Sequence, residues 1–435
     1  MTLETTLRED ALAAARRYAE EAFAPSEFVA GQTTIPVAGR VIGAPELEAL
    51  IDASLDGWLT EGRFAARFAP AFARAAGRDH ALLVGSGSQA NLLAVAGACS
   101  RLLERPLAPG DEVITPALGF ATTIAPIYQQ GLVPVFVDVE METLNPSLDA
   151  FAEAIGERTR SVMAAHCLGN PFDAARLGEL CAERGLVLIE DCCDALGSTL
   201  GGRPVGTFGA VATHSFYPAH HMTTGEGGAV VADDPDWVRA LGSLREWGRD
   251  CWCPPGVNDA CGHRFEGSYG DLPEGYDHKY VFSQLGFNFK ITDMQAALGL
   301  AQLERLDGFH SARRANFARL DAALADLDDE LLRVRAIEGA DPSWFGYPFT
   351  LREGGAERRT ALQRFLLERR IDSRLLLGGN LTRQPALQGL GHRVAGPLTN
   401  ADRITEASLW VGCYPGLSEP MVDWIAESLR AFFGR

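Results

Sequence analysis

The sequence predicts an α/β protein with a large domain built on a mainly parallel sheet and a smaller C-terminal α/β domain. Short apolar runs alternate with helical patterns through residues 44–300. This alternation is typical of a parallel sheet whose two faces are covered by helices. The chain has 435 residues, 47% of them hydrophobic and 22% charged. That length and composition suit a globular protein of two domains.

Each element follows from a local pattern. An N-terminal helix and an irregular arm are expected over residues 1–43, the large domain over 44–300 and the small domain over 301–435. One long helix is predicted from 292 to 327, and a Cys-, Gly- and Pro-rich insertion at 251–275 interrupts the order. The predicted strands of the large domain are residues 81–85, 111–116, 133–139, 161–166, 186–191, 211–218 and 227–233.

The net charge restricts which partners the protein can bind, and the expected compartment restricts the roles of its cysteines. The formal net charge is -18, and an acidic protein without a basic run repels nucleic acid and anionic membranes. The N-terminus lacks the apolar core of a signal peptide, and no apolar stretch approaches membrane-spanning length, so a cytoplasmic protein is expected. Nine cysteines in a reducing compartment are then core residues, catalytic thiols or metal ligands rather than disulfides.

Two motifs suggest a ligand site at strand ends. GSGSQAN, residues 85–91, follows a strand and opens a helix, where free N–H groups favour a phosphate; a simple strand-to-helix turn is the alternative. LVLIED, residues 186–191, ends a buried strand with Glu190 and Asp191. Asp191 faces the crevice at the strand ends. It could cap the next helix or pair with the pyridinium nitrogen of a pyridoxal cofactor.

These motifs occur in order with TPALGFATT, SFYPAHHMTTGEGG and GFNFKITDMQAALG. Across nearly its whole length the chain resembles the pyridoxal-phosphate sugar aminotransferases of the DegT/StrS type, which have fold type I. The resemblance implies that Gly87, Ser88 and Ser215 hold the cofactor phosphate. It also implies that Phe120 stacks on the pyridine ring and that Asp191 pairs with the ring nitrogen.

The same resemblance implies a homodimer, because Asn288 would reach the phosphate of the cofactor in the neighbouring subunit. Asp194 stands where the family usually has Gln or His facing the 3-hydroxyl of the cofactor. Together with Tyr217, Asp194 marks a variant subgroup among the cofactor-binding residues.

The lysine that forms the Schiff base in this family is missing. It would follow Ser215 by five residues, and that position is His220. The chain has two lysines, Lys279 and Lys290, and neither fits the motif. The cofactor is therefore expected to be held non-covalently as pyridoxamine phosphate (PMP), with the imidazole of His220 as general base. The adjacent His221 is expected to pack or to form a hydrogen bond.

Four cysteines suggest a metal centre. The gaps between Cys193, Cys251, Cys253 and Cys261 are 57, one and seven residues. By ligand count four thiolates suit zinc or a [2Fe–2S] cluster equally, and buried thiols are a third possibility. The spacing resembles the [2Fe–2S] motif of NDP-4-keto-6-deoxyhexose 3-dehydrases, which also carry histidine in place of lysine. The spacing favours Cys193 over Cys192. The cysteines expected in the core are Cys99, Cys167, Cys181 and Cys413.

This resemblance implies C3-deoxygenation of a CDP- or dTDP-linked 4-keto-6-deoxyhexose, which could be a 2,6-dideoxy sugar. PMP would form a Schiff base at C4, His220 would remove the C4′ proton, the C3 hydroxyl would leave, and two single electrons would arrive through the cluster. The electrons would come from a separate flavin and iron–sulfur reductase using NAD(P)H, or from ferredoxin or flavodoxin with its reductase. Scarce lysine beside abundant alanine and arginine suggests a GC-rich genome and favours dTDP-sugars of antibiotic-type secondary metabolism.

Substrate contacts are expected in the C-terminal region, because paired hydrogen bonds from arginine suit a diphosphate. The candidates are Arg374, Asn380, Arg383 and Arg403. Two alternatives stay open from the sequence. One is a redox-silent sugar 3-dehydratase or aminotransferase without a cluster, and the other is a non-catalytic module stabilised by zinc.

Overall fold

The computed structural model describes residues 2–24, 27–251, 253 and 256–435. Its largest sheet has eight strands in the order β1-β9-β8-β5-β4-β2-β3-β14. The strands from β8 to β14 in this order are parallel to their neighbours, whereas β9 is antiparallel to both β8 and β1. Their bounds are β1 His80–Val84, β2 Glu112–Pro116, β3 Val133–Val137, β4 Thr159–Ala165, β5 Val187–Asp191, β8 Val211–Ser215, β9 Gly228–Ala232 and β14 Arg393–Val394.

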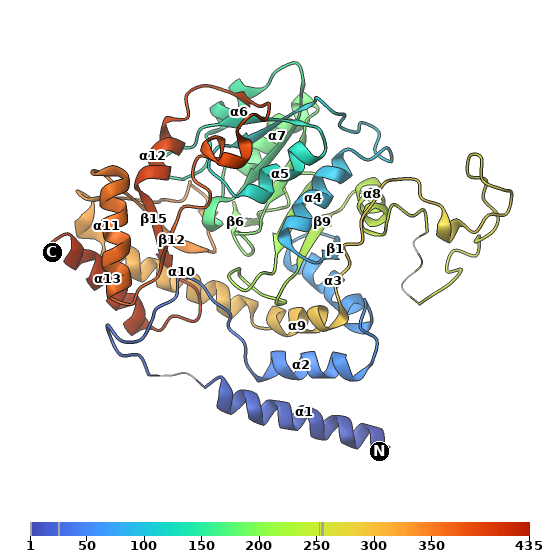
Figure 1. The fold of residues 1–435 in the computed structure, drawn as a ribbon, viewed down its shortest axis with the longest axis horizontal. Coiled ribbons are helices and arrows are strands. Elements are labelled where there is room, and N and C mark those ends of the chain that lie inside the picture. Colours follow the sequence, from blue (N-terminus) through green and yellow to red (C-terminus); the bar gives the residue numbers. More distant parts are fainter. Residues whose placement is uncertain (1, 25–26, 252, 254–255) are drawn as a thin grey trace.

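Helices cover both faces of this sheet (Figure 1). Successive strand residues alternate between the faces: Val113 and Ile189 pack with α4 and α8, whereas Ile114 and Leu188 pack with α6 and α7. Both faces are therefore apolar, and the strands read as continuous hydrophobic runs. The covering helices are α4 Gly87–Ala98, α5 Ala121–Gln129, α6 Leu148–Ala154, α7 Ala174–Arg184 and α8 Pro235–Arg245.

A second, antiparallel sheet has the order β10-β12-β15-β13 and forms its own core with the C-terminal helices. Its strands are β10 Leu331–Arg333, β12 Gly346–Leu351, β13 Ser373–Leu375 and β15 Ser408–Gly412, and its helices are α10 Leu306–Ala323, α11 Gly355–Glu368, α12 Thr399–Ala407 and α13 Glu419–Phe432. The short strands β6 Thr199–Leu200, β7 Arg203–Pro204 and β11 Ala340–Asp341 make a third sheet, and the 3-10 turns are Cys167–Gly169, His278–Tyr280, Ala325–Leu327, Leu381–Arg383 and Pro385–Leu387.

The N-terminal helix α1 (Leu3–Ala22) lies against α2 (Ala44–Leu55) (Figure 1). Arg8 pairs with Asp52 at 2.6 Å, and Arg16 pairs with Glu48 at 2.6 Å. Helices α3 (Arg63–Ala75) and α9 (Asp293–Leu303) pack beside α2 and complete this part of the body. No helix of the described residues is long and apolar enough to cross a membrane.

The single long helix predicted over 292–327 is wrong. Helix α9 ends at Leu303 and α10 begins at Leu306. The backbone N–H of Arg305 donates to the carbonyl of Gln302 in a tight turn, and its guanidinium binds the buried carboxylate of Glu46 at 2.6 Å. Because this anchor lies in α2, far away in the sequence, the continuous helical pattern gave no sign of the break.

The Cys-rich insertion leaves the body of the molecule. We call the described residues 250, 251, 253 and 256–282 the projecting segment. It extends beyond α8, on the right of Figure 1 in yellow, and its regular structure among the described residues is the turn His278–Tyr280.

Two buried histidines, His214 and His310, make stability depend on pH. Burial lowers the pKa of each from 6.5 to about 4. Between these values the unfolded chain binds more protons than the folded one, so stability is complete above about pH 6.5 and falls as the pH approaches 4, by roughly 3 kcal/mol per histidine. The charged or titratable neighbours are Asp191, Glu190, His166 and Arg78 around His214, and Arg313 and Arg314 around His310.

Urea unfolding at about pH 8 and about pH 5 tests this expectation, because the free energy of unfolding should be lower at the acid pH. His310→Gln should reduce the difference in the free energy of unfolding between the two pH values by about the contribution of one histidine, because it removes one buried imidazole. The matched control is His80→Gln at an exposed position, which should leave the difference unchanged. Equal pH dependence in all three proteins would contradict the assignment.

Candidate active site

The predicted site lies where β5 and β8 end and where α4 and α5 begin, which is the usual place for ligands in an open α/β sheet. Asp191, the last residue of β5, is buried. Its carboxylate accepts hydrogen bonds from Asn91 Nδ2 at 2.9 Å, from Thr123 Oγ1 at 2.7 Å and from the N–H of Cys193 at 3.1 Å. These three donors fix the orientation of the carboxylate.

Sequence reasoning missed the residues that hold Asp191. Asn91 lies on α4, Thr123 lies on α5, and Thr213 Oγ1 donates to Asn91 Oδ1 at 2.6 Å. Asn91 is the last letter of the GSGSQAN motif, but nothing local to that motif indicates that its amide reaches a carboxylate 100 positions away.

A phosphate cradle lies next to this carboxylate. Ser86 caps α4 by accepting the N–H of Gln89, which leaves the first N–H groups of the helix, at Gly87 and Ser88, directed outward. Ser215 ends β8 beside them: a Cβ placed on Gly87 would lie 2.5 Å from Ser215 Cβ and 3.1 Å from Cys193 Sγ. The structure thus brings Gly87, Ser215 and Cys193 together.

Two large aromatic side chains border the site and are exposed. Phe120 precedes α5 as its N-cap residue, and Tyr217 follows β8. An exposed aromatic ring, a fixed carboxylate and a helix N-terminus with nearby hydroxyl groups together fit the ring, the ring nitrogen and the phosphate of a pyridoxal-type cofactor. The residues present therefore fit PMP or pyridoxal phosphate.

His220 lies beside Asp194. The distance from His220 Nδ1 to Asp194 Oδ1 is 3.3 Å, and both side chains are largely buried, with 15% and 17% exposed. The angle is not that of a regular hydrogen bond, so Nδ1 has no geometrically good acceptor in this structure. Such contacts in ligand-free sites often tighten when substrate binds. The His220 ring also packs on Phe345, with ring centroids 5.2 Å apart.

The loop that carries His220 is clamped to the second sheet. Arg313 on α10 is fully buried, and its guanidinium donates to the carbonyls of Trp344, Phe345 and His220 at 3.0–3.1 Å. His221 Nε2 bonds the carbonyl of Ser343 at 2.7 Å. The expectation that His221 forms a structural hydrogen bond is confirmed. Arg313 gave no sequence signal, because its partners are backbone carbonyls.

Both lysines are engaged elsewhere. Lys279 Nζ donates to Asn258 Oδ1 at 2.6 Å in the projecting segment, and Lys290 Nζ pairs with Glu246 at 2.9 Å while lying over the Trp247 ring. Neither lysine is therefore available at the position of His220.

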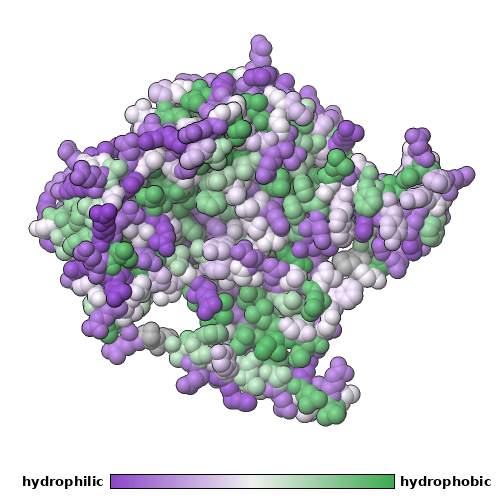
Figure 2. Space-filling view, in the orientation of Figure 1, coloured by the Kyte–Doolittle hydropathy of each residue, from purple (hydrophilic) through white to green (hydrophobic). Residues whose placement is uncertain are grey.

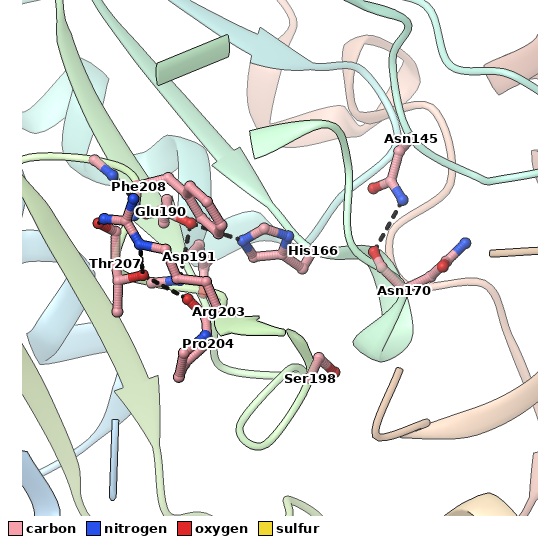
Figure 3. A network of polar contacts seen from close by, with 12 residues as sticks. Asn145, His166, Asn170, Glu190, Asp191, Ser198, Arg203, Pro204, Thr207 and Phe208 are labelled. Atoms are coloured by element: carbon pink, nitrogen blue, oxygen red, sulfur yellow. Dashed lines mark hydrogen bonds and ion pairs between the residues drawn. The ribbon is translucent and has the colours of Figure 1, made fainter. Parts of the chain in front are cut away.

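Glu190, next to Asp191, has a structural role (Figure 3). Its carboxylate accepts the N–H groups of Gly206, Phe208 and Gly209 at 2.6–2.8 Å and lies 3.2 Å from His166 Nε2. Burial acts to raise the pKa of Glu190, but these donors, His166 foremost, hold it below its usual value. The network fixes the loop after β7 against the end of β5.

The four predicted cluster ligands fall into two places. Cys193 lies in the body beside Gly87, whereas Cys251, Cys253 and Cys261 lie on the projecting segment. In a single chain the ligand atoms of these four cysteines form no group of three or more within 4.8 Å of one another. The expected core cysteines Cys167, Cys181 and Cys413 are buried, and Cys99 is partly buried.

The predicted substrate residues lie outside this constellation. Asn380 is buried, with Nδ2 donating to Asp402 at 2.9 Å and Oδ1 capping Thr382. Arg383 pairs with Asp402, and Arg403 donates to the carbonyl of Leu351. These three side chains form hydrogen bonds and an ion pair within the C-terminal region, whereas Arg374 is exposed. The backbone of 378–381 nevertheless pairs with 117–119, next to Phe120. Asn288 is exposed.

Comparison with known proteins identifies the class. Residues 41–430 match the DegT/DnrJ/EryC1/StrS aminotransferase family, and the chain belongs to this family. It is 50% identical over 425 residues to dTDP-4-dehydro-2,6-dideoxy-D-glucose 3-dehydratase of Saccharopolyspora spinosa, covering 98% of this chain and 92% of that protein. It is 49% identical over 429 residues to lipopolysaccharide biosynthesis protein RfbH of Salmonella typhimurium, covering 98% of each.

A solved structure agrees with these relatives. E. coli GDP-4-keto-6-deoxy-D-mannose-3-dehydratase with bound hydrated PLP superimposes with a TM-score of 0.82 at 29% identity, covering 91% of this chain and 99% of that one. The predicted α/β fold of the pyridoxal-phosphate sugar aminotransferases is confirmed. The predicted resemblance to the NDP-4-keto-6-deoxyhexose 3-dehydrases, a class of enzymes, is confirmed as well.

Gly87→Ala should weaken binding of PMP at least about tenfold, because the new methyl group must displace Ser215 at the phosphate cradle. Spectroscopic titration with PMP measures the dissociation constant. Gly242→Ala on α8 is the matched control, since its Cβ would meet only Leu82 Cδ2 at 3.7 Å. Equal affinity in the two variants would contradict the placement of the cradle.

Proposed function

We propose that the chain removes the C3 hydroxyl of a nucleotide-linked 4-keto-6-deoxyhexose, using PMP and two electrons delivered singly through a [2Fe–2S] cluster. The observation that carries the proposal is the imidazole of His220 at the base position, 3.3 Å from Asp194, with both lysines engaged elsewhere. The relative at 50% identity is named as a 3-dehydratase of a dTDP-linked 4-keto sugar, and it supports the reaction class.

The residues of the chain first position the cofactor. Gly87, Ser88 and Ser215 would bind its phosphate, Phe120 would cover one face of its ring, and Asp191 would hold its ring nitrogen in the protonated form. PMP supplies an amine that condenses with the C4 ketone and an electron-poor ring that makes its C4′ hydrogen acidic. The three donors to Asp191 keep the carboxylate in one orientation for this contact.

His220 then moves the proton. Asp194 lies 3.3 Å from His220 Nδ1 and would accept the Nδ1–H once this contact tightens, which would leave Nε2 free to take the C4′ proton as the C3 hydroxyl departs. The imidazolium that results is stabilised by the adjacent carboxylate. This role for Asp194 differs from the contact with the cofactor 3-hydroxyl expected from the resemblance. Tyr217 lies 6.5 Å from the His220 ring, centroid to centroid, where it borders the substrate space.

A one-electron carrier explains why an iron–sulfur centre, rather than redox-inactive zinc, would accompany this chemistry. The electrons would come from a separate reductase, or from ferredoxin or flavodoxin with its reductase. A homodimer is part of the proposal, with the exposed Asn288 facing the partner's cofactor. The sugar would be CDP- or dTDP-linked, with Arg374 the most accessible of the predicted diphosphate contacts.

One observation favours a cluster-free dehydratase: in a single chain Cys193 is not gathered with the other three cysteines. Iron and acid-labile sulfide in anaerobically purified protein decide between the two. The proposal expects about two of each per chain, with a visible spectrum that is lost in Cys253→Ser. Well-folded protein without iron that still binds PMP would support the cluster-free alternative.

A further inference from the structure

We propose that the [2Fe–2S] site is completed between two copies of this chain: Cys251, Cys253 and Cys261 of one copy meet Cys193 of the other. The inference rests on the cluster of the proposed function and goes beyond it by stating which chains supply the ligands.

Three cysteines lie near one another on the projecting segment. Cys253 Sγ accepts the N–H of Ala260 at 3.3 Å, and Cys251 and Cys261 both lie close to Cys253. Cys261 Sγ lies 3.4 Å from His278 Nε2. Cysteine sulfurs are the usual ligands of a [2Fe–2S] cluster. This segment therefore supplies three ligands.

Cys193 lies elsewhere, inside the body of its own chain. Its neighbours are Gly87 at the start of α4, together with Asp191 and Asp194, whereas the projecting segment leaves the body beyond α8 (Figure 1). Among the described residues, no group of three or more potential ligand side chains with atoms within 4.8 Å of one another contains any of these four cysteines. In a single chain the four thiols are therefore not gathered as a ligand set, and binding a cluster requires the segment to close around it as well as a fourth ligand.

The projecting segment and the residues just after it have a surface that needs a partner. Leu285 is 98% exposed, and large apolar side chains accompany it, which Figure 2 shows as green residues among purple ones on the right. A cavity of about 360 Å³ opens beside Cys261 and is bordered by Asp250, Tyr269 and His278. The exposed apolar side chains of this region are Val257, Phe265, Leu272, Tyr280, Phe282 and Leu285.

The occupant is a second copy because the missing ligand is a cysteine of this same sequence. In a two-fold symmetric dimer each projecting segment would lie on the body of the other copy, and the two contacts would be equivalent. Such an arrangement covers the apolar side chains and gives four thiolates at each of two sites. It also brings each cluster next to the cofactor site, since Cys193 adjoins Gly87 and Ser215.

Mixed dimers test this arrangement. Cys193→Ser and Cys253→Ser chains carrying different affinity tags are co-expressed, and the mixed dimer is isolated by two successive affinity steps. Completion between copies leaves one intact site, formed by Cys193 of one chain and the segment of the other, so about two irons per dimer are expected, against about four in wild type. Each variant alone should hold none. Ligation within one chain would give no iron in the mixed dimer.

The inverse pairing gives the opposite result. One chain carries both substitutions and is paired with a wild-type chain, which leaves no complete site between copies but one complete site within the wild-type chain. Iron, sulfide and the electron paramagnetic resonance signal of the reduced cluster are the measurements. Iron in this pairing, or in a wild-type monomer, would overturn the proposal. Wild-type dimer that binds PMP but holds no iron would overturn the cluster of the proposed function itself.

Discussion

Replacing His220 with alanine is expected to slow removal of the C4′ proton about 1,000-fold. The His220→Ala variant would lack the proposed base and would keep the proposed cofactor contacts of Asp191, Gly87 and Ser215. The dissociation constant of PMP and the iron content should therefore stay near wild type. Loss of the hydrogen from C4′ of PMP in deuterated buffer, with dTDP-4-keto-6-deoxy-D-glucose or its CDP analogue present, measures the step by NMR.

The matched control is His80→Ala, at an exposed position on β1, which should exchange the C4′ hydrogen at the wild-type rate. Exchange in His220→Ala at the wild-type rate would mean that a different group is the base. His221 is not a suitable one, because burial lowers its pKa well below the usual range and its Nε2 is committed to Ser343.

Asp194→Asn is expected to lower the same exchange rate about 100-fold with little change in substrate KM. The amide of Asn can either accept a hydrogen bond from Nδ1–H or donate one to an unprotonated Nδ1. It therefore no longer enforces the tautomer that leaves Nε2 free, and it cannot stabilise the imidazolium. The corresponding change in a serine protease triad costs about 10⁴ in kcat; a smaller effect is expected here because Asp194 is partly exposed and its contact with His220 is long.

A double-mutant cycle separates this role from cofactor binding. If Asp194 acts through His220, Asp194→Asn in the His220→Ala background should cost nothing further. If it binds the 3-hydroxyl of the cofactor instead, the losses should multiply and PMP affinity should fall. Asp341→Asn, in an exposed pair with Arg314 at 2.9 Å, is the matched control and should behave as wild type.

Much of the fold could be predicted because it depends on local patterns. The strands from β1 to β9 that build the large sheet lie within a few residues of the apolar runs that predicted them, since strands buried on both faces need uninterrupted hydrophobic residues. The position of His220 followed from counting five residues from Ser215. This count could be made from the sequence because Ser215 and His220 lie in one short continuous stretch of chain.

The supports of the site could not be predicted, because they are contacts between distant segments. Asn91 on α4 and Thr123 on α5 donate to Asp191 at the end of β5, and Arg313 on α10 donates to the carbonyl of His220. The spacing of the cysteines indicated four ligands, but spacing cannot say which chain each ligand comes from. The placement of Cys193 in the body, next to Gly87, is the observation behind the proposed ligation between two copies.

The most direct test of C3-deoxygenation is the product itself. Anaerobic protein with its cluster and PMP is incubated with a chemical reductant and dTDP-4-keto-6-deoxy-D-glucose or its CDP analogue, and the sugar is examined by NMR. The account predicts a methylene group at C3, formed only when the reductant is present and absent with His220→Ala. A product that keeps its C3 hydroxyl and gains an amine at C4, or a C3-deoxygenated product formed equally without reductant, would contradict it.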